Sequence, residues 1–108
     1  MIVIASKYLV PKGYAGMAVF PFIFVADKKS INPIFLNHER IHLRQQLELL
    51  IVPFYAWYVL EYFIRRIRYK NHYQAYRNIS FEREAYTNEH NLNYLGHRGF
   101  WAFLKFVR

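Results

Sequence analysis

The segment NPIFLNHERIHLRQQLELL, residues 32–50, constrains the fold of this chain more than any other stretch. Asn32 is a residue type that favours the position just before a helix. Pro33 suits the first helical turn, because its missing N–H would be unpaired there anyway. These signals predict a helix over residues 33–50. Pro53 is expected to end or kink it, and a second helical run is predicted to continue to about Tyr69.

The chain before this helix has the composition of β-strands. Residues 1–27 are rich in β-branched and aromatic side chains and contain the turn-like sequence PKGYAG, residues 11–16. We predict a hairpin or short sheet, with MAVFPFIFVAD, residues 17–27, as its second strand. Pro21 cannot donate a hydrogen bond to a neighbouring strand, so this strand is expected at the edge of the sheet.

The chain after residue 79 predicts a further helix. Ser80 is expected to cap a helix that carries FEREAYTNEHNLNYL and stops at Gly96, and the aromatic C-terminal segment is expected to pack on the core. A length of 108 residues suits one domain. The sequence therefore predicts an α+β fold in a single domain over residues 1–108, with a small N-terminal sheet followed mainly by helices.

Composition limits the chemistry and the partners. The chain has no cysteine, which excludes disulfides and thiolate metal ligands, and its net charge of +8 favours anionic partners. The longest apolar stretch, residues 49–60, is shorter than the roughly 20 residues that cross a bilayer, and it predicts a buried or an interfacial helix. No secretory signal is evident. We expect a cytoplasmic protein, with peripheral membrane association left open.

Two histidines in the first helix carry the clearest chemical signal. His38 and His42 are four residues apart, so both imidazoles lie on one helical face and can bind one metal ion. Glu39 lies about 100° around the helix from His38. Its carboxylate is thus beside the metal, where it can take a proton from a water molecule. The pattern His-Glu-x-x-His predicts a zinc site with its own general base.

A catalytic zinc ion normally needs a third protein ligand. Helical geometry separates Glu82 from Glu84 by about 200°, and it does not decide which of the two faces the site. The candidates for this third ligand are His72, Glu82, Glu84, Glu89, His90 and His97.

The sequences NHERIH and, about forty residues later, FEREAY resemble the gluzincin branch of the zincin metallopeptidases, in particular small minigluzincin-like proteins. The resemblance covers about half of the chain. It implies a minimal zincin-like domain that hydrolyses peptide bonds in a peptide or protein substrate. It also implies that His38, His42 and Glu82 bind Zn²⁺ and that Glu39 is the general base. Tyr86 departs from related membrane-associated gluzincins, which usually have aspartate there.

The sequence leaves several roles open. Five residues are candidates for stabilising the oxyanion of the reaction, and three polar residues near the motif are candidates to orient the ligands. The first set is Tyr86, His90, Tyr94, His97 and Arg98, and the second is Asn37, Gln45 and Gln46. The alternatives to a peptidase are a catalytically weak zinc-binding relative and a basic module that binds a membrane surface or nucleic acid. Nucleic acid is the less favoured partner, because no nucleic-acid motif is present.

Overall fold

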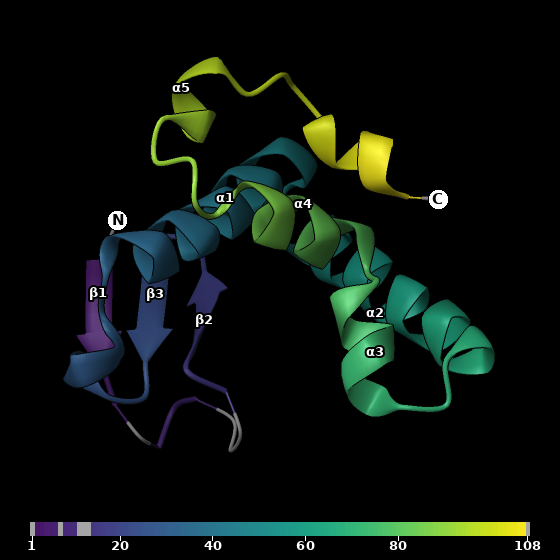
Figure 1. Cartoon of the computed structure of the whole chain (residues 1–108), viewed down its shortest axis with the longest axis horizontal. Helices are drawn as coiled ribbons and strands as arrows, with labels where there is room; N and C mark the ends of the chain where they lie inside the picture. Colours follow the sequence, from purple (N-terminus) through teal and green to yellow (C-terminus); the bar gives the residue numbers. More distant parts are fainter. Residues whose placement is uncertain (1, 7, 11–13, 108) are drawn as a thin grey trace.

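The computed structural model describes residues 2–6, 8–10 and 14–107. It confirms the predicted α+β class, with a small N-terminal sheet followed by helices (Figure 1). The sheet has the strand order β1–β3–β2, in which β2 runs antiparallel to β3 and β1 runs parallel to it. Residues 11–13 of the predicted turn lie outside the described residues. The strands are β1 (Ile2–Ala5), β2 (Gly16–Val19) and β3 (Phe22–Val25).

The stretch predicted as one edge strand is a hairpin. Val19 pairs with Phe22, and Phe20 and Pro21 form the turn between β2 and β3. The prediction was wrong because the missing N–H of proline suits a turn as well as a sheet edge. The strand after Pro21, β3, is the central one, and β2 is an edge strand.

The first helix begins where the sequence predicts. In α1 (Pro33–Leu49) the Asn32 side chain accepts a hydrogen bond from the Phe35 N–H at 2.8 Å. The chain turns at Leu50, which has a φ of 64°, and α2 (Ile51–Arg68) leaves at 111° to α1. Pro53 lies in the first turn of α2, where its missing donor costs no helical bond. The predicted break at Pro53 is therefore wrong by one turn.

Three short helices follow α2, and the one predicted to begin at Ser80 is shorter than expected. The helix expected to run from a Ser80 cap to Gly96 is α4 (Ser80–Asn88), which ends eight residues earlier. Its first N–H, on Ser80, donates to Glu61 of α2 at 2.9 Å, so a carboxylate from another helix satisfies this end. The other elements are α3 (His72–Arg77), α5 (Tyr94–His97) and the 3₁₀ helices η1 (Lys28–Ser30) and η2 (Ala102–Phe106).

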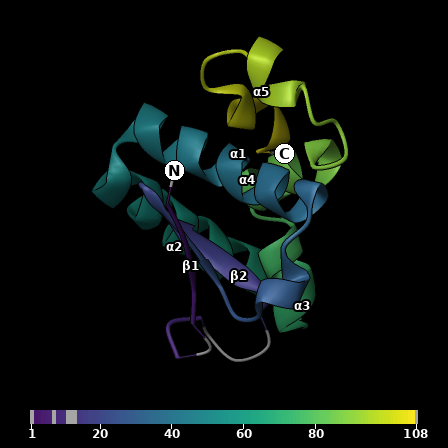
Figure 2. The ribbon, with the colours of Figure 1, turned by 90° about the vertical axis from the view of Figure 1, so that its left-hand side faces the viewer.

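Two apolar clusters hold these elements together. One joins the sheet to α1, and the other joins α2, α4 and the C-terminal segment, which packs on the core as predicted. Figure 1 shows the sheet and the α2–α3 pair on opposite sides of the molecule, with α1 and α4 between them, and Figure 2 shows α1 crossing the sheet. The clusters are Ala18, Ile23, Val25 and Leu43, and Phe54, Ile79, Phe81 and Phe103.

The helix α2 covers the longest apolar stretch of the sequence but is buried on one side only. Its buried residues are Phe54, Glu61 and Arg65. Within the described part of the chain, no single helix is long and apolar enough to cross a membrane. The pair of α1 and α2 reaches that length and composition only when the two bent helices are taken together.

Candidate metal centre

Two helices bring three ligand atoms together. His38 and His42 project from α1, and Glu82 projects from the first turn of α4. The Nε2 atoms of the two histidines are 3.2 Å apart, and Glu82 Oε1 lies 3.1 Å from His42 Nε2 and 3.3 Å from His38 Nε2. All three residues are buried. The side chains therefore form a nearly equilateral triangle in the interior of the protein.

The triangle has the dimensions of a zinc site. Ligands that surround zinc tetrahedrally at 2.0–2.1 Å lie about 3.3 Å from one another. The three observed separations of 3.1–3.3 Å match this spacing. Imidazole nitrogens and a carboxylate oxygen are also ligand types that zinc accepts. The residues present thus fit a divalent metal ion such as zinc.

Hydrogen bonds on the far side of each imidazole fix its tautomer. His38 Nδ1 lies 2.8 Å from Glu89 Oε1, and an ionised carboxylate can only accept, so His38 Nδ1 donates. His42 Nδ1 lies 2.9 Å from Gln45 Oε1, which is the accepting atom of that amide. In its neutral form each imidazole then has its lone pair on Nε2, directed at Glu82. Three such electron-pair donors facing one another can share a cation, either a proton or a metal ion.

The position of Glu82 is fixed from its other oxygen. The Tyr58 hydroxyl, on α2, donates to Glu82 Oε2 at 2.7 Å and leaves Oε1 for the histidines. Because Tyr58 is on a third helix, the site joins α1, α2 and α4. Nothing in the sequence pattern around Tyr58 distinguishes it from the other aromatic residues of α2, and we did not predict this role.

The contacts of Glu82 and Glu84 distinguish the two residues, which helical geometry alone could not do. Glu84 is fully buried and points to the opposite side of α4. Arg98 donates to both of its oxygens, and the Tyr94 hydroxyl donates at 2.7 Å. Gln45 Nε2 donates to Glu84 Oε1 at 2.9 Å, which ties this network to His42. Glu84 is therefore a support of the site and not one of the three converging ligands.

Electrostatics tie His42 and Glu82 to each other. Burial by itself lowers the pKa of His42, but the adjacent Glu82 carboxylate outweighs burial and raises it to about 9. Burial likewise raises the pKa of Glu82, and the two imidazoles reverse that shift and hold it well below its usual range. Without a metal ion the pair shares a proton, which a divalent ion displaces when it binds.

Glu39 stands beside this triangle with a free oxygen. It is buried, and among the described residues its Oε2 atom has no hydrogen-bond partner. Burial raises the pKa of its carboxyl group, although the nearby imidazoles of His42 and His38 act in the opposite direction. A buried carboxylate seldom lacks a partner unless it serves a ligand or a reaction. The motif assigns the role of general base to this carboxylate, and that role stays a prediction.

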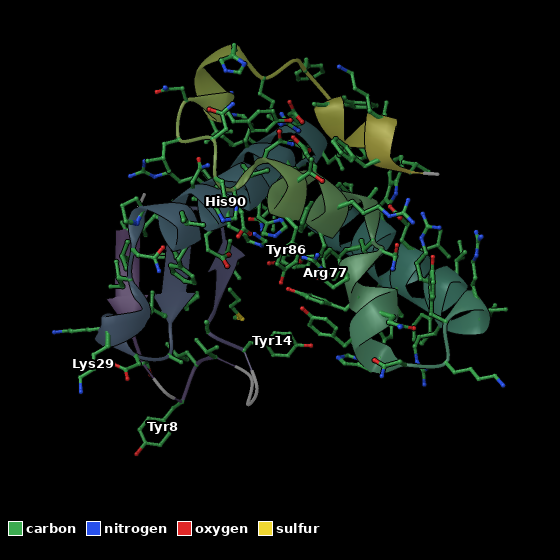
Figure 3. The ribbon with its side chains drawn as sticks, in the orientation of Figure 1. Tyr8, Tyr14, Lys29, Arg77, Tyr86 and His90 are labelled. Carbon is green, nitrogen blue, oxygen red and sulfur yellow. The ribbon has the colours of Figure 1, made fainter. Side chains whose placement is uncertain are left out.

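A cavity of about 330 Å³ adjoins Glu39, His42 and Glu82. Its wall is mainly aromatic, and the edge strand β2 closes one side with Gly16, Met17 and Ala18. In Figure 3 the Tyr14 ring extends from the sheet side toward α3, where its hydroxyl lies 2.9 Å from His72 Nε2. The aromatic lining residues are Tyr14, Phe54, Tyr55, Tyr58, Tyr62 and Tyr76.

The remaining third-ligand candidates do not converge on the triangle of His38, His42 and Glu82. His72 is bound between the hydroxyls of Tyr14 and Tyr62, at 2.9 and 2.7 Å. The His90 side chain is 72% exposed, and His97 is exposed beside the Tyr94 ring. Glu89, also a candidate, is the partner of His38.

The oxyanion candidates are also distinguished by their contacts. Tyr94 and Arg98 are engaged with Glu84, whereas the Tyr86 ring packs against His38 with 4.5 Å between ring centroids. Arg77 lies over the Tyr86 ring, with 3.7 Å from its Cζ atom to the ring centroid, and Figure 3 shows the two side chains together. Tyr86 and Tyr76 both line a second cavity that contains His38 and Glu39. Tyr76 was not among the sequence candidates.

The three amide side chains near the motif, Asn37, Gln45 and Gln46, each bind a different part of the molecule. Gln45 orients His42, as described above. Gln46 binds the backbone of β2, donating to Ala18 O at 2.8 Å and accepting from Phe20 N. Asn37 Nδ2 donates to the carbonyls of Asn88, Glu89 and Asn91, which ends α4 and positions Glu89 beside His38. These three side chains thus connect α1 to the sheet, to Glu84 and to the segment that carries Glu89.

Comparison of the chain with protein-family models, with curated proteins and with solved structures finds no match.

Proposed function

We propose that this protein is a small zinc-dependent hydrolase that cleaves peptide bonds, with His38, His42 and Glu82 as ligands and Glu39 as general base. The observation that carries the proposal is the triangle of ligand atoms, 3.1–3.3 Å on each side, next to a buried Glu39 oxygen that has no hydrogen-bond partner in the described part of the chain. The resemblance of the two sequence motifs to gluzincins supports the same chemistry.

The protein side chains supply the proton transfers and the orientation. A bound zinc ion would polarise a peptide carbonyl and acidify a water molecule. Glu39 takes the proton of the attacking water, and its raised pKa suits a group that later returns that proton to the leaving nitrogen. Tyr76 and Tyr86 line the cavity at Glu39, and burial raises the pKa of both, so they stay protonated and can donate to the developing oxyanion.

The cavity beside the centre indicates the kind of substrate. Its aromatic wall and its volume of about 330 Å³ suit a large apolar side chain next to the cleaved bond. The edge strand β2 borders the same cavity, and an extended peptide can pair with such an edge through backbone hydrogen bonds. We therefore propose peptides with a bulky apolar residue at the cleavage site as substrates.

The test is zinc analysis combined with cleavage of a mixed peptide library read by mass spectrometry. The purified wild type, dialysed against zinc and then freed of excess metal, should contain about one zinc per chain. His38→Ala and Glu82→Ala should lose it, whereas Glu84→Gln and the exposed His90→Ala should keep it. Glu39→Gln should bind zinc like the wild type and lose cleavage.

The outcomes separate two functions. Absence of zinc after loading would refute the metal centre. Zinc bound at His38, His42 and Glu82 without cleavage of any peptide would identify a catalytically silent zinc-binding relative. The structure offers a reason for such a relative, since a metal ion held by residues of α1 and α4 would also cross-link the two helices. Cleavage that persists in Glu39→Gln would point to a contaminating peptidase.

A further inference from the structure

The solvent-facing side of α2 is apolar along most of its length. The exposed fractions of Val52, Leu60, Phe63 and Ile67 are 77%, 61%, 61% and 88%. Leu60, Phe63 and Ile67 are spaced by three and four residues, and Val52 precedes Leu60 by eight residues, or about two turns, so all four lie on one side of the helix. Val59 and Ile64 are also exposed and widen this apolar side of the helix. We name this set of six residues the α2 face.

No charged side chain interrupts the α2 face. The acidic residue within the helix, Glu61, is buried on the opposite side, where it accepts hydrogen bonds from Trp57 and Ser80. Scattered exposed apolar residues are ordinary on proteins, but a continuous apolar helix face marks a surface that meets a partner or a membrane.

Basic residues lie at the C-terminal end of the α2 face. Phe63 and Ile67 share a shallow groove with Arg66 and Lys70, and Arg68 is exposed nearby. The Arg66 side chain is partly engaged, because it donates to the carbonyls of Tyr69 and Lys70 at 3.2 and 2.5 Å. A positively charged rim thus adjoins an apolar strip.

The rest of the surface is also strongly basic. All seven acidic residues of the chain are described by the structure, and Asp27 is the one that is exposed. The other six acidic side chains are buried or half-buried, so they contribute little negative charge to the surface. They are Glu39, Glu48, Glu61, Glu82, Glu84 and Glu89. The net charge of +8 is therefore carried on a surface with almost no compensating carboxylate.

Three classes of partner can be compared, and an anionic bilayer is the one that suits both the apolar α2 face and the basic residues at its end. A second copy of this chain could cover the apolar residues, but it would bring two +8 surfaces and two basic rims together. Nucleic acid would neutralise the basic residues and leave Leu60 and Ile67 in water. A bilayer of anionic lipids accepts the apolar side chains at the acyl boundary and the basic ones at the phosphates.

We propose that α2 docks this protein onto anionic lipid bilayers, lying in the plane of the membrane surface. Its 18 residues form a helix about 27 Å long that rests on the interface without crossing it. Tyr62 borders both the groove at Phe63 and Ile67 and the aromatic cavity beside Glu39, so the docked face and the cavity adjoin each other. The inference stands on exposure and charge alone and does not depend on the metal centre.

Vesicle flotation tests the proposal with purified full-length protein. The wild type should float with vesicles of phosphatidylcholine and phosphatidylglycerol and bind pure phosphatidylcholine weakly. Phe63→Glu/Ile67→Glu should reduce binding to the anionic vesicles on the order of 100-fold, because two large side chains lose their apolar environment. Both positions are more than half exposed, so the fold should tolerate the change. Leu9→Glu/Leu92→Glu adds the same two negative charges at exposed positions outside α2, so it is the matched control and should lose far less binding.

A second pair of variants isolates the charge. Arg68→Gln/Lys70→Gln should weaken binding to the anionic vesicles on the order of tenfold. Lys28→Gln/Lys29→Gln removes the same net charge from η1, far from α2 in the sequence, and should have a smaller effect. The proposal fails if the wild type does not float, if Phe63→Glu/Ile67→Glu floats equally well, or if the wild type sediments as a dimer that this variant abolishes. It also fails if single-stranded nucleic acid binds with the same dependence on Phe63 and Ile67.

Discussion

The hydroxyl of Tyr58 donates a hydrogen bond to Glu82 Oε2 at 2.7 Å, while Glu82 Oε1 lies within 3.3 Å of the Nε2 atoms of both His38 and His42. One tyrosine therefore decides which carboxylate oxygen faces the imidazoles. Burial raises the pKa of Tyr58, and the neighbouring Glu82 carboxylate raises it further, so the hydroxyl keeps its proton and remains a donor.

Tyr58→Phe should lower the affinity for zinc by about tenfold or more, because partners of metal ligands typically contribute that much. The ring packing against Phe54 and Phe81 is retained, so the thermal stability should change little. Competition with a chromophoric chelator measures the affinity. Tyr62→Phe is the control, because its hydroxyl pairs with His72 and not with Glu82. Equal affinities for the two variants would contradict the role assigned to Tyr58.

Arg98→Met should lower the free energy of unfolding by about 3–5 kcal/mol, the usual cost of removing one member of a buried ion pair. The Arg98 side chain is fully buried between Glu48 and Glu84, and without it both carboxylates would lose their counter-charge. Urea unfolding followed by circular dichroism gives the value. Arg68→Met, at an exposed position of α2, should change the stability by no more than about 0.5 kcal/mol. A similarly small loss for Arg98→Met would mean that the network does not stabilise the fold.

Gly16→Ala should destabilise the protein by about 1–3 kcal/mol through crowding. A Cβ atom at Gly16 would lie 2.5 Å from Phe35 Cζ and 2.6 Å from the Phe24 carbonyl oxygen, and the second of these is backbone and cannot turn away. The comparison is Gly99→Ala, where the added atom would meet nothing within 4 Å. Thermal melts of both variants test the difference. If Gly16→Ala melts at or above the temperature of Gly99→Ala, then β2 and α1 approach each other less closely than described.

The parts of the site that depend on local spacing could be predicted from the sequence. His38 and His42 share one helical face because of their four-residue interval, and Glu39, the residue after His38, lies beside that face whatever surrounds them. The end signals of α1 are equally local, and Asn32 and Pro33 act as predicted.

The choice between Glu82 and Glu84 is not local. It depends on what meets each side of α4: Tyr58 and the histidines on one side, and Arg98 with Tyr94 on the other. Glu89 shows the same limit, since the sequence marked it as a ligand candidate and the fold places it behind His38. Pro21 was assigned to an edge strand because its missing N–H fits there, and a turn fits that property as well. In each case a residue type allows several environments, and contacts distant in sequence select one.

Zinc affinity should increase with pH up to about 9 and then level off. In the metal-free protein the pKa of His42 is raised to about 9 by Glu82, which overcomes the opposing effect of burial. Below that pH His42 carries a proton that zinc must displace, so the apparent affinity should rise about tenfold per pH unit. Above it His42 is already neutral and the dependence should vanish.

Calorimetric titrations in buffers of different ionisation enthalpy count the released protons directly. At pH 7 the wild type should release about one proton per zinc ion bound. Glu39→Gln should release a similar number, because the direct partner of the His42 proton, Glu82, is unchanged. Glu82→Gln removes that partner, and any residual binding should release a smaller fraction of a proton, since the pKa of His42 then falls. A wild type that binds zinc with the same affinity from pH 7 to about 9 would show that His42 and Glu82 do not share a proton in the metal-free site.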